Sequence, residues 1–306
     1  MNKCFSLLFS FTLFFSFGQL KQGDTYRVFY LGGQSNMDGY GSNEDLPDSL
    51  TSGLEDVWIF HGTSAADGVK TGGQGKWQQL SPGHGRGFWN NGKKNILSKS
   101  FGIELSFAKQ MKKLFPNDKI ALIKYSRGGT SIDSLGARKA GCWEPDVKGK
   151  EGINQYDHFL QTLEIAYSQY DINGDKRVDK LIPSGIVWMQ GESDANVEEI
   201  AAKYYDHLKR LTDLMRAALR KDDLPLVLGK ISDSGRSPAG KVWRYGDLVQ
   251  YAQEKLALSD PNIAIVRNTK YYKYSDPWHY NSAGYIDLGK AFADALHKLI
   301  ITFESN

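Results

Sequence analysis

The sequence predicts an α/β protein with a central parallel sheet covered by helices on both faces, and two observations lead to this. First, short runs rich in β-branched and aromatic residues recur, and each is continuously apolar, as expected for strands buried on both faces. Second, helical patterns lie between these runs, and a chain that alternates strand and helix forms a parallel sheet with right-handed crossovers. The predicted strands span residues 26–32, 119–126, 184–190, 224–231 and 263–268.

Three helices are predicted because apolar residues recur at three- and four-residue steps and give one apolar stripe. They span residues 101–115, 195–221 and 282–300. Residues from about 38 to 100 differ, since Gly, Asn, Ser and Asp abound there and helical periodicity is weak. We expect a long loop insertion over the sheet end, which either forms a substrate rim or packs on its own aromatic side chains.

The first residues, "MNKCFSLLFSFTLFFSFGQL", combine an early lysine, a short apolar run and small residues at its end. This pattern predicts a signal peptide over residues 1–18, with cleavage after about Gly18, and a secreted or periplasmic protein. Residues 19–306 would then form a single domain. An uncleaved anchor is the alternative, but no apolar stretch reaches the ~20 residues that a membrane-spanning helix needs. We therefore expect no membrane span in the mature chain.

Composition narrows the possible partners. Hydrophobic residues make up 41% of the chain and aromatic residues 12%, which excludes a disordered protein. The net charge of +3 is small for 306 residues, and the basic residues are scattered. We therefore expect no nucleic-acid partner. The oligomeric state leaves no readable pattern.

Polar motifs follow three of the predicted strands and precede the last helix. Ligands of parallel α/β sheets bind at the carboxyl ends of strands, so these motifs are the place to look for chemistry. They are "GGQSNM" with Gln34, Ser35 and Asn36, "SRGGTSI" with Gly128 and Gly129, "QGESD" with Gln190 and Glu192, and "DPWH" with Asp276 and His279.

These residue types together suit acyl transfer. A serine hydroxyl attacks an acyl carbon only if a base removes its proton, and His279 can do so if Asp276 fixes its tautomer. The oxyanion needs preorganised donors, which the amide of Ser35, an amide of Gly128 or Gly129, and the Gln190 side chain could supply. Each motif alone has an ordinary structural interpretation, since a serine in a glycine-rich turn is usually a turn residue. Their order along the chain favours catalysis.

With these motifs in place, the chain resembles the SGNH-type hydrolases, specifically carbohydrate esterase family 6 and the related sialate O-acetylesterases. "GGQSNM", "GGTSI", "WMQGESD" and "DPWH" carry the resemblance, which spans residues 28–288. It implies a flavodoxin-like three-layer α/β/α sandwich, the SGNH hydrolase fold, and hydrolysis of O-acetyl esters on carbohydrate without a metal or organic cofactor.

Carried over residue by residue, the resemblance makes Ser35 the nucleophile, His279 the base and Asp276 its partner. Gly128 or Gly129 becomes the residue of the second motif that contributes to the oxyanion hole.

The supporting residues are less clearly defined. Many SGNH enzymes have an asparagine in the third motif, whereas this chain has "QGE", so an oxyanion role of Gln190 departs from the common pattern. Glu192 would hold the loop or orient Gln190. The supporting residues Gln34 and Asn36 flank Ser35, and Asn36 is either a helix-start cap or a substrate contact. Arg127 either pairs with Glu192, contacts substrate or is a solvated surface charge.

The function that this resemblance implies is a secreted carbohydrate O-acetylesterase acting on an acetylated carbohydrate, such as acetylated xylan. A sialate O-acetylesterase is the alternative substrate class. A non-catalytic carbohydrate-binding protein on an esterase scaffold is the alternative of another class, because the chain is rich in aromatic residues suited to sugar stacking.

One further motif remains. In "DINGDKRVD", at 171–179, Asp171, Asn173, Asp175 and Asp179 occupy positions 1, 3, 5 and 9 of a calcium-binding loop. The pattern lacks the turn glycine at position 6 and the acid at position 12. The segment is therefore either a calcium site or a polar loop before the third strand.

Overall fold

The computed structural model describes residues 21–304 except 53, 66–68, 70, 148–152 and 236–239. The predicted signal peptide, residues 1–18, lies outside the described residues. None of the described helices is long and apolar enough to cross a membrane.

A seven-stranded sheet forms the centre of the fold, in the order β11-β10-β9-β1-β8-β3-β4. Every neighbouring pair is parallel except β3 and β4. The strands are β1 (Gln22–Gly33), β3 (Val57–His61), β4 (Gln78–Gln79), β8 (Lys119–Ser126), β9 (Val178–Met189), β10 (Leu226–Gly229) and β11 (Ile263–Val266).

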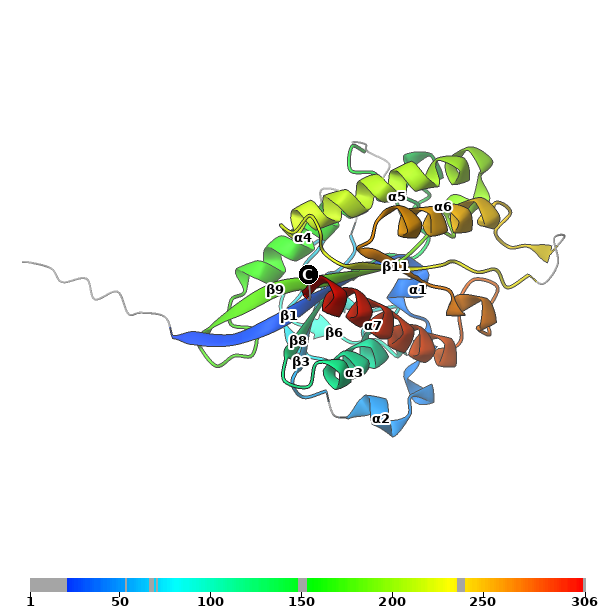
Figure 1. Ribbon diagram of the computed structural model, residues 1–306. Helices are drawn as coiled ribbons and strands as arrows, with labels where there is room; N and C mark the ends of the chain where they lie inside the picture. The colour runs from blue at the N-terminus through cyan, green and yellow to red at the C-terminus, as the bar shows by residue number, and fades with distance from the viewer. Residues whose placement is uncertain are drawn as a thin grey trace, which may run out of the picture.

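Helices cover both faces of this sheet (Figure 1). On one face, α3 (Glu104–Leu114) packs against the C-terminal helix α7 (Ser282–Glu304). On the other face lie α4 (Gln155–Ser168), α5 (Glu198–Ala218) and α6 (Gly246–Ser259). The predicted three-layer α/β architecture is confirmed.

Short elements complete the chain. They are the helices α1 (Ser35–Asp38) and α2 (Asp48–Thr51), the 3₁₀ turns η1 (Asn43–Asp45), η2 (Ser134–Gly136), η3 (Asp194–Asn196) and η5 (Asn268–Tyr271), and the two-residue strands β2 (Gly41–Ser42), β5 (Trp89–Asn90), β6 (Asn95–Ile96) and β7 (Ser100–Phe101).

All five predicted strands are present, because their continuous apolar runs are buried between the helix layers. The expected loop insertion over residues 38–100 is wrong in part, because two strands of the central sheet lie within it. The "VWIFH" run of β3 pairs in parallel with β8, and β4 pairs with β3. Helices α4 and α6 were also not predicted, since buried polar residues such as His158 and Gln253 interrupt their apolar pattern.

The register of the sheet sets the position of the site. Gly33, the last residue of β1, lies opposite Ser126 of β8 and Met189 of β9. The segments that follow these three strands therefore lie side by side at the carboxyl ends of the strands, where parallel α/β sheets bind their ligands.

Candidate active site

Ser35 begins α1, two residues after a sharp exit from the sheet. Gly33 has φ +144°, and a Cβ there would lie 2.0 Å from the carbonyl oxygen of Met189. Only glycine allows this close approach of two backbones. Gln34 then donates its N–H to the same Met189 oxygen at 2.9 Å. Ser35 is consequently held at the N-terminus of a short helix, where it is 6% exposed.

His279 and Asp276 form a pair on the loop before α7. The ring Nδ1 of His279 lies 2.7 Å from Asp276 Oδ2, and Asp276 Oδ1 accepts the N–H groups of Trp278 and His279. Burial opposes ionisation of Asp276, but the hydrogen bonds with His279 and the two N–H groups lower its pKa. An ionised Asp276 can only accept a hydrogen bond, so it favours the tautomer of His279 that carries its proton on Nδ1. Nε2 of the ring is then the basic nitrogen.

Asn36 joins the serine turn to the histidine loop. Its carboxamide donates to the Trp278 carbonyl at 3.2 Å and accepts from the Tyr280 N–H at 3.4 Å. Its oxygen also accepts from the Tyr285 hydroxyl at 2.9 Å. The residue after Ser35 thus contacts both neighbours of His279. Asn36 is 1% exposed, so the structure favours a structural cross-link over a substrate contact.

Glu192 is the fourth partner of Asn36. Its Oε1 accepts from Asn36 Nδ2 at 2.7 Å, while its buried Oε2 has no partner among the described residues. Burial raises the pKa of Glu192, and the bond from Asn36 only partly opposes this. Glu192 therefore joins the loop after β9 to α1 through Asn36, and it has no hydrogen bond with Gln190 among the described residues.

Gln190 is fully buried and bonded to protein groups on both sides of its amide. Its Nε2 lies 2.6 Å from Asp194 Oδ2, 3.1 Å from the Thr130 carbonyl and 3.3 Å from Gln34 Oε1. An amide nitrogen carries two hydrogens, and three protein acceptors already surround it. This arrangement leaves no hydrogen of Gln190 for a substrate oxyanion.

Asp194 completes that network. Its carboxyl accepts the N–H groups of Ile132 and Asp133 in addition to the Gln190 amide. Complete burial raises the pKa of Asp194 to about 7, against these hydrogen bonds. The network connects the end of β9 to the segment after Gly129.

Gly128 is the glycine that adjoins the nucleophile. A Cβ on Gly128 would lie 3.2 Å from Ser35 Cβ and 3.3 Å from Asp38 Oδ2. Gly129 has φ +78°, and a Cβ there would approach only Ala140. Of the two predicted positions, Gly128 is therefore the one beside Ser35.

Asp38 is a site residue that the sequence interpretation missed. Its carboxyl accepts from the Ser126 hydroxyl and from the Gly128 N–H. Burial raises its pKa, while those two hydrogen bonds and the charges of Lys124 and Arg127 oppose the rise. Asp38 follows Ser35 by one helical turn, and that spacing was the signal that could have identified it.

Tyr40 was also missed. Its ring stacks on the His279 imidazole, with centroids 3.5 Å apart and planes 9° from parallel. The Arg86 guanidinium lies over the Tyr40 ring at 4.9 Å. Tyr40 thereby fixes the plane of the proposed base from a segment more than 200 residues away in sequence.

A polar cavity of about 350 Å³ opens beside the serine turn. This volume falls within the usual range of ligand pockets, about 300–1,000 Å³. Arg127, for which the sequence left three interpretations, lines the cavity and donates to Ser64 Oγ at 2.7 Å. The lining residues also include Asp38, Tyr40, His61, Arg86 and Gly128.

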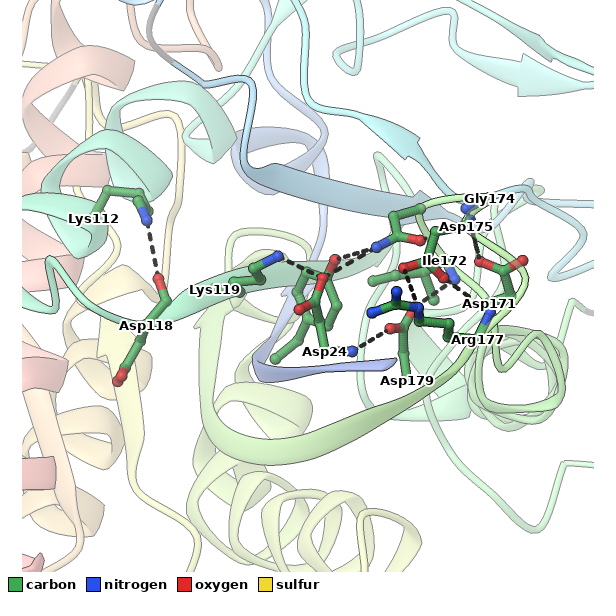
Figure 2. Close-up of polar contacts among 12 residues, drawn as sticks. Asp24, Lys112, Asp118, Lys119, Asp171, Ile172, Gly174, Asp175, Arg177 and Asp179 are labelled. Atoms are coloured by element: carbon green, nitrogen blue, oxygen red, sulfur yellow. Dashed lines mark hydrogen bonds and ion pairs between the residues drawn. The ribbon is translucent and has the colours of Figure 1, made fainter. Parts of the chain in front are cut away.

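The acidic loop at 171–179 lies beside Asp24, near the start of β1 (Figure 2), whereas the serine turn follows the other end of this strand. Asp171 accepts the N–H groups of Gly174, Asp175 and Lys176, and Asp179 accepts those of Asp24 and Ile172. The carboxylates thus satisfy backbone donors of the loop. Within the described residues, no group of three or more His, Cys, Asp or Glu side chains could hold a metal ion.

The mostly parallel α/β sheet, with these motifs at its strand ends, has the architecture expected of the SGNH-type esterases. A family model described as "Carbohydrate esterase, sialic acid-specific acetylesterase" matches residues 25–298. The chain belongs to this carbohydrate esterase family, and it is a carboxylic ester hydrolase.

Solved structures share the fold. A protein of Arabidopsis thaliana is 22% identical, with a TM-score of 0.60 over 90% of this chain and 98% of that chain. NanS is 16% identical, with a TM-score of 0.56 over 93% and 99% of the two chains. XAC1771, a carbohydrate acetylesterase from Xanthomonas citri, is 16% identical with a TM-score of 0.58, over 90% of this chain and only 56% of its own. No curated protein matches the chain in sequence.

Proposed function

We propose that this protein is a secreted O-acetylesterase that uses Ser35 to remove acetyl groups from a polysaccharide such as acetylated xylan. One observation carries the assignment of the site. Asn36, directly after Ser35, bonds the residues on both sides of His279, while Asp276 bonds the ring of His279 itself. The nucleophile and the base are thereby fixed on one framework.

In the proposed reaction, Ser35 Oγ attacks the acetyl carbonyl carbon while Nε2 of His279 takes the hydroxyl proton. Asp276 stabilises the imidazolium that forms. The C–O bond to the sugar then breaks, and His279 returns the proton to the sugar oxygen. Water, deprotonated by the same imidazole, next attacks the carbonyl carbon of the acetyl-serine ester. The bond from this carbon to Ser35 Oγ then breaks, His279 returns the proton to Ser35 Oγ, and acetate is released.

The oxyanion formed in both steps needs donors aimed at it. The Ser35 N–H, at the N-terminus of α1, and the backbone N–H groups of Gly128 and Gly129 are the proposed donors. The Gly128 N–H donates to Asp38, so the oxyanion would have to compete for it. Gln190 is not among the proposed donors, because protein acceptors surround its amide nitrogen.

Acetylated sialic acid is the second candidate substrate. The description of the matching family supports it. The guanidinium groups of Arg86 and Arg127 at the cavity also suit a sugar that carries a carboxylate. The predicted signal peptide, outside the described residues, supports a location beyond the cytoplasm.

The test compares acetate release by the purified protein from acetylated xylan and from an acetylated sialoside, with Ser35→Ala as the control. We expect xylan to be the faster substrate and the variant to be inactive on both. Faster acetate release from the sialoside would show that acetylated sialic acid is the preferred substrate. An unchanged rate in Ser35→Ala would remove Ser35 from the mechanism.

A further inference from the structure

A chain of side-chain hydrogen bonds runs from Asn95 to the cavity beside Ser35 and ends at His61. His61 is the last residue of β3, lines the cavity and is 5% exposed. Its Nδ1 lies 3.3 Å from Nδ1 of His84, and His84 Nε2 lies 3.0 Å from Gln78 Nε2. The donor and the acceptor of each of these hydrogen bonds can be assigned by starting from Asn95, whose amide orientation is fixed.

Asn95 is that anchored end, because the backbone of Lys76 fixes both sides of its amide. Asn95 Oδ1 accepts the Lys76 N–H at 3.2 Å, and Asn95 Nδ2 donates to the Lys76 carbonyl at 2.8 Å. The same Nδ2 donates to Gln78 Oε1 at 2.7 Å. Gln78 Oε1 is therefore the acceptor, so its Nε2 must be the donor to His84.

A donor at Gln78 determines both histidine tautomers. His84 Nε2 accepts from Gln78, so the proton of a neutral His84 is on Nδ1 and is donated to His61 Nδ1. The proton of a neutral His61 is then on Nε2. Burial and the charge of Lys124 lower the pKa of both rings, for His84 to about 3, so both stay neutral.

The Nε2–H of His61 has no protein acceptor among the described residues. The ring is also held in place, since it stacks on Phe88 with centroids 3.9 Å apart. A buried ring with fixed orientation and one unused donor at a polar cavity is suited to bind an oxygen atom of a ligand. The cavity is continuous with the nucleophile through Gly128, which borders both.

We propose that His61 is a specificity-determining residue whose Nε2–H donates to a sugar oxygen of the acetylated substrate, with Gln78 and His84 fixing the tautomer that makes this possible. This inference rests on the proposed function for the identity of the ligand. The tautomer itself does not depend on it.

The first test reads the tautomer directly, by ¹⁵N–¹H NMR of the histidine side chains. We expect wild-type His61 to carry its proton on Nε2. Gln78→Glu places a carboxylate against His84 Nε2, which forces the His84 proton onto Nε2 and the His61 proton onto Nδ1. Gln79→Glu adds the same charge at the next residue, whose side chain bonds the Glu55 carbonyl, and should leave both tautomers unchanged. A wild-type His61 protonated on Nδ1 would overturn the proposal.

The second test measures substrate preference. In His61→Phe and in Gln78→Glu, KM for an acetylated oligosaccharide should rise about tenfold more than KM for 4-nitrophenyl acetate, as expected for one lost hydrogen bond. Gln79→Glu should match the wild type on both esters. Equal losses on the two esters, or no loss on the oligosaccharide, would contradict the proposal.

The third test separates this inference from the proposed reaction. Titrating acetylated oligosaccharide into Ser35→Ala protein should shift the His61 Nε2–H resonance, whether or not the wild type turns the sugar over. If the wild type releases no acetate but this shift occurs, the proposed function fails and the binding role of His61 stands. If no shift occurs, the role of His61 fails.

Discussion

The Asn36 carboxamide donates a hydrogen bond to the carbonyl oxygen of Trp278, and so joins the residue after Ser35 to the residue before His279. This cross-link is buried and has further bonds to Glu192, Tyr280 and Tyr285. Removing Asn36 would leave several buried polar groups without partners. The relation between nucleophile and base would then depend on the two loops alone.

Asn36→Ala should therefore reduce both stability and catalysis. The unpaired buried groups should lower the free energy of unfolding by about 1–3 kcal/mol. The kcat for 4-nitrophenyl acetate should fall at least tenfold. Only a small fraction of the variant should be unfolded, so unfolding alone would not explain this fall. Urea denaturation and steady-state kinetics measure the two effects. Asn268→Ala, which removes one exposed side-chain bond to Asp287, is the control. Full activity in Asn36→Ala would refute the cross-link's role.

Tyr40 should act through its ring and not through its hydroxyl. Tyr40→Phe keeps the ring stacked on His279 and should retain kcat within about twofold. Tyr40→Leu removes the stacked face, worth about 0.5–1.5 kcal/mol for an aromatic pair, and should lower kcat about tenfold. Equal rates in the two variants, measured on one activated acetyl ester, would show that the stacking does not position the base.

Gly128→Ala tests the space beside the nucleophile. The new Cβ would lie 3.2 Å from Ser35 Cβ, tighter than ordinary van der Waals contact, although the backbone conformation of Gly128 tolerates alanine. We expect kcat/KM to fall at least tenfold with little change in Tm. Gly246→Ala, where the Cβ would lie 3.4 Å from Trp243, should change neither. A Gly128→Ala enzyme of wild-type activity would exclude a substrate position against this glycine.

Asp194 makes stability depend on pH. Its folded pKa of about 7 exceeds the ordinary value of 3.8, so between these values the folded chain binds a proton that the unfolded chain has lost. Stability from this group is complete below about pH 4 and is lost as pH rises, by about 1.4 kcal/mol per pH unit up to pH 7. Asp38 and Glu192 have raised pKa values and act in the same direction.

Urea titrations at several pH values check this prediction. Asp194→Asn lacks the titrating carboxyl, so its free energy of unfolding should vary less between pH 4 and pH 7 than that of the wild type, even if it is lower throughout. Parallel pH profiles for the two proteins would show that Asp194 is ionised in the folded state.

The sequence was sufficient for the α/β layers and for the four motifs, because both depend on local patterns. Continuous apolar runs identified β1 and β8, and the order of "GGQSNM" and "DPWH" indicated Ser35 and His279. The carboxyl-end rule then placed the motifs at one edge of the sheet.

What could not be predicted depends on contacts between distant segments. Tyr40 meets His279 across more than 200 residues, and Asp38 meets Gly128 across 90. Gln190 has the same side chain whether it faces a substrate or Asp194, and only the folded chain shows its acceptors. Strand β3 was hidden because a single short apolar run stood in a region of loop composition.

In the proposed reaction, Ser35 carries the acetyl group during turnover. The most direct measurement is peptide mass spectrometry of enzyme quenched in acid while it hydrolyses 4-nitrophenyl acetate. We expect an acetylated peptide with the modification on Ser35 in the wild type, and neither that peptide nor acetate release in Ser35→Ala. Acetylation at another residue together with an unchanged rate in Ser35→Ala would contradict it.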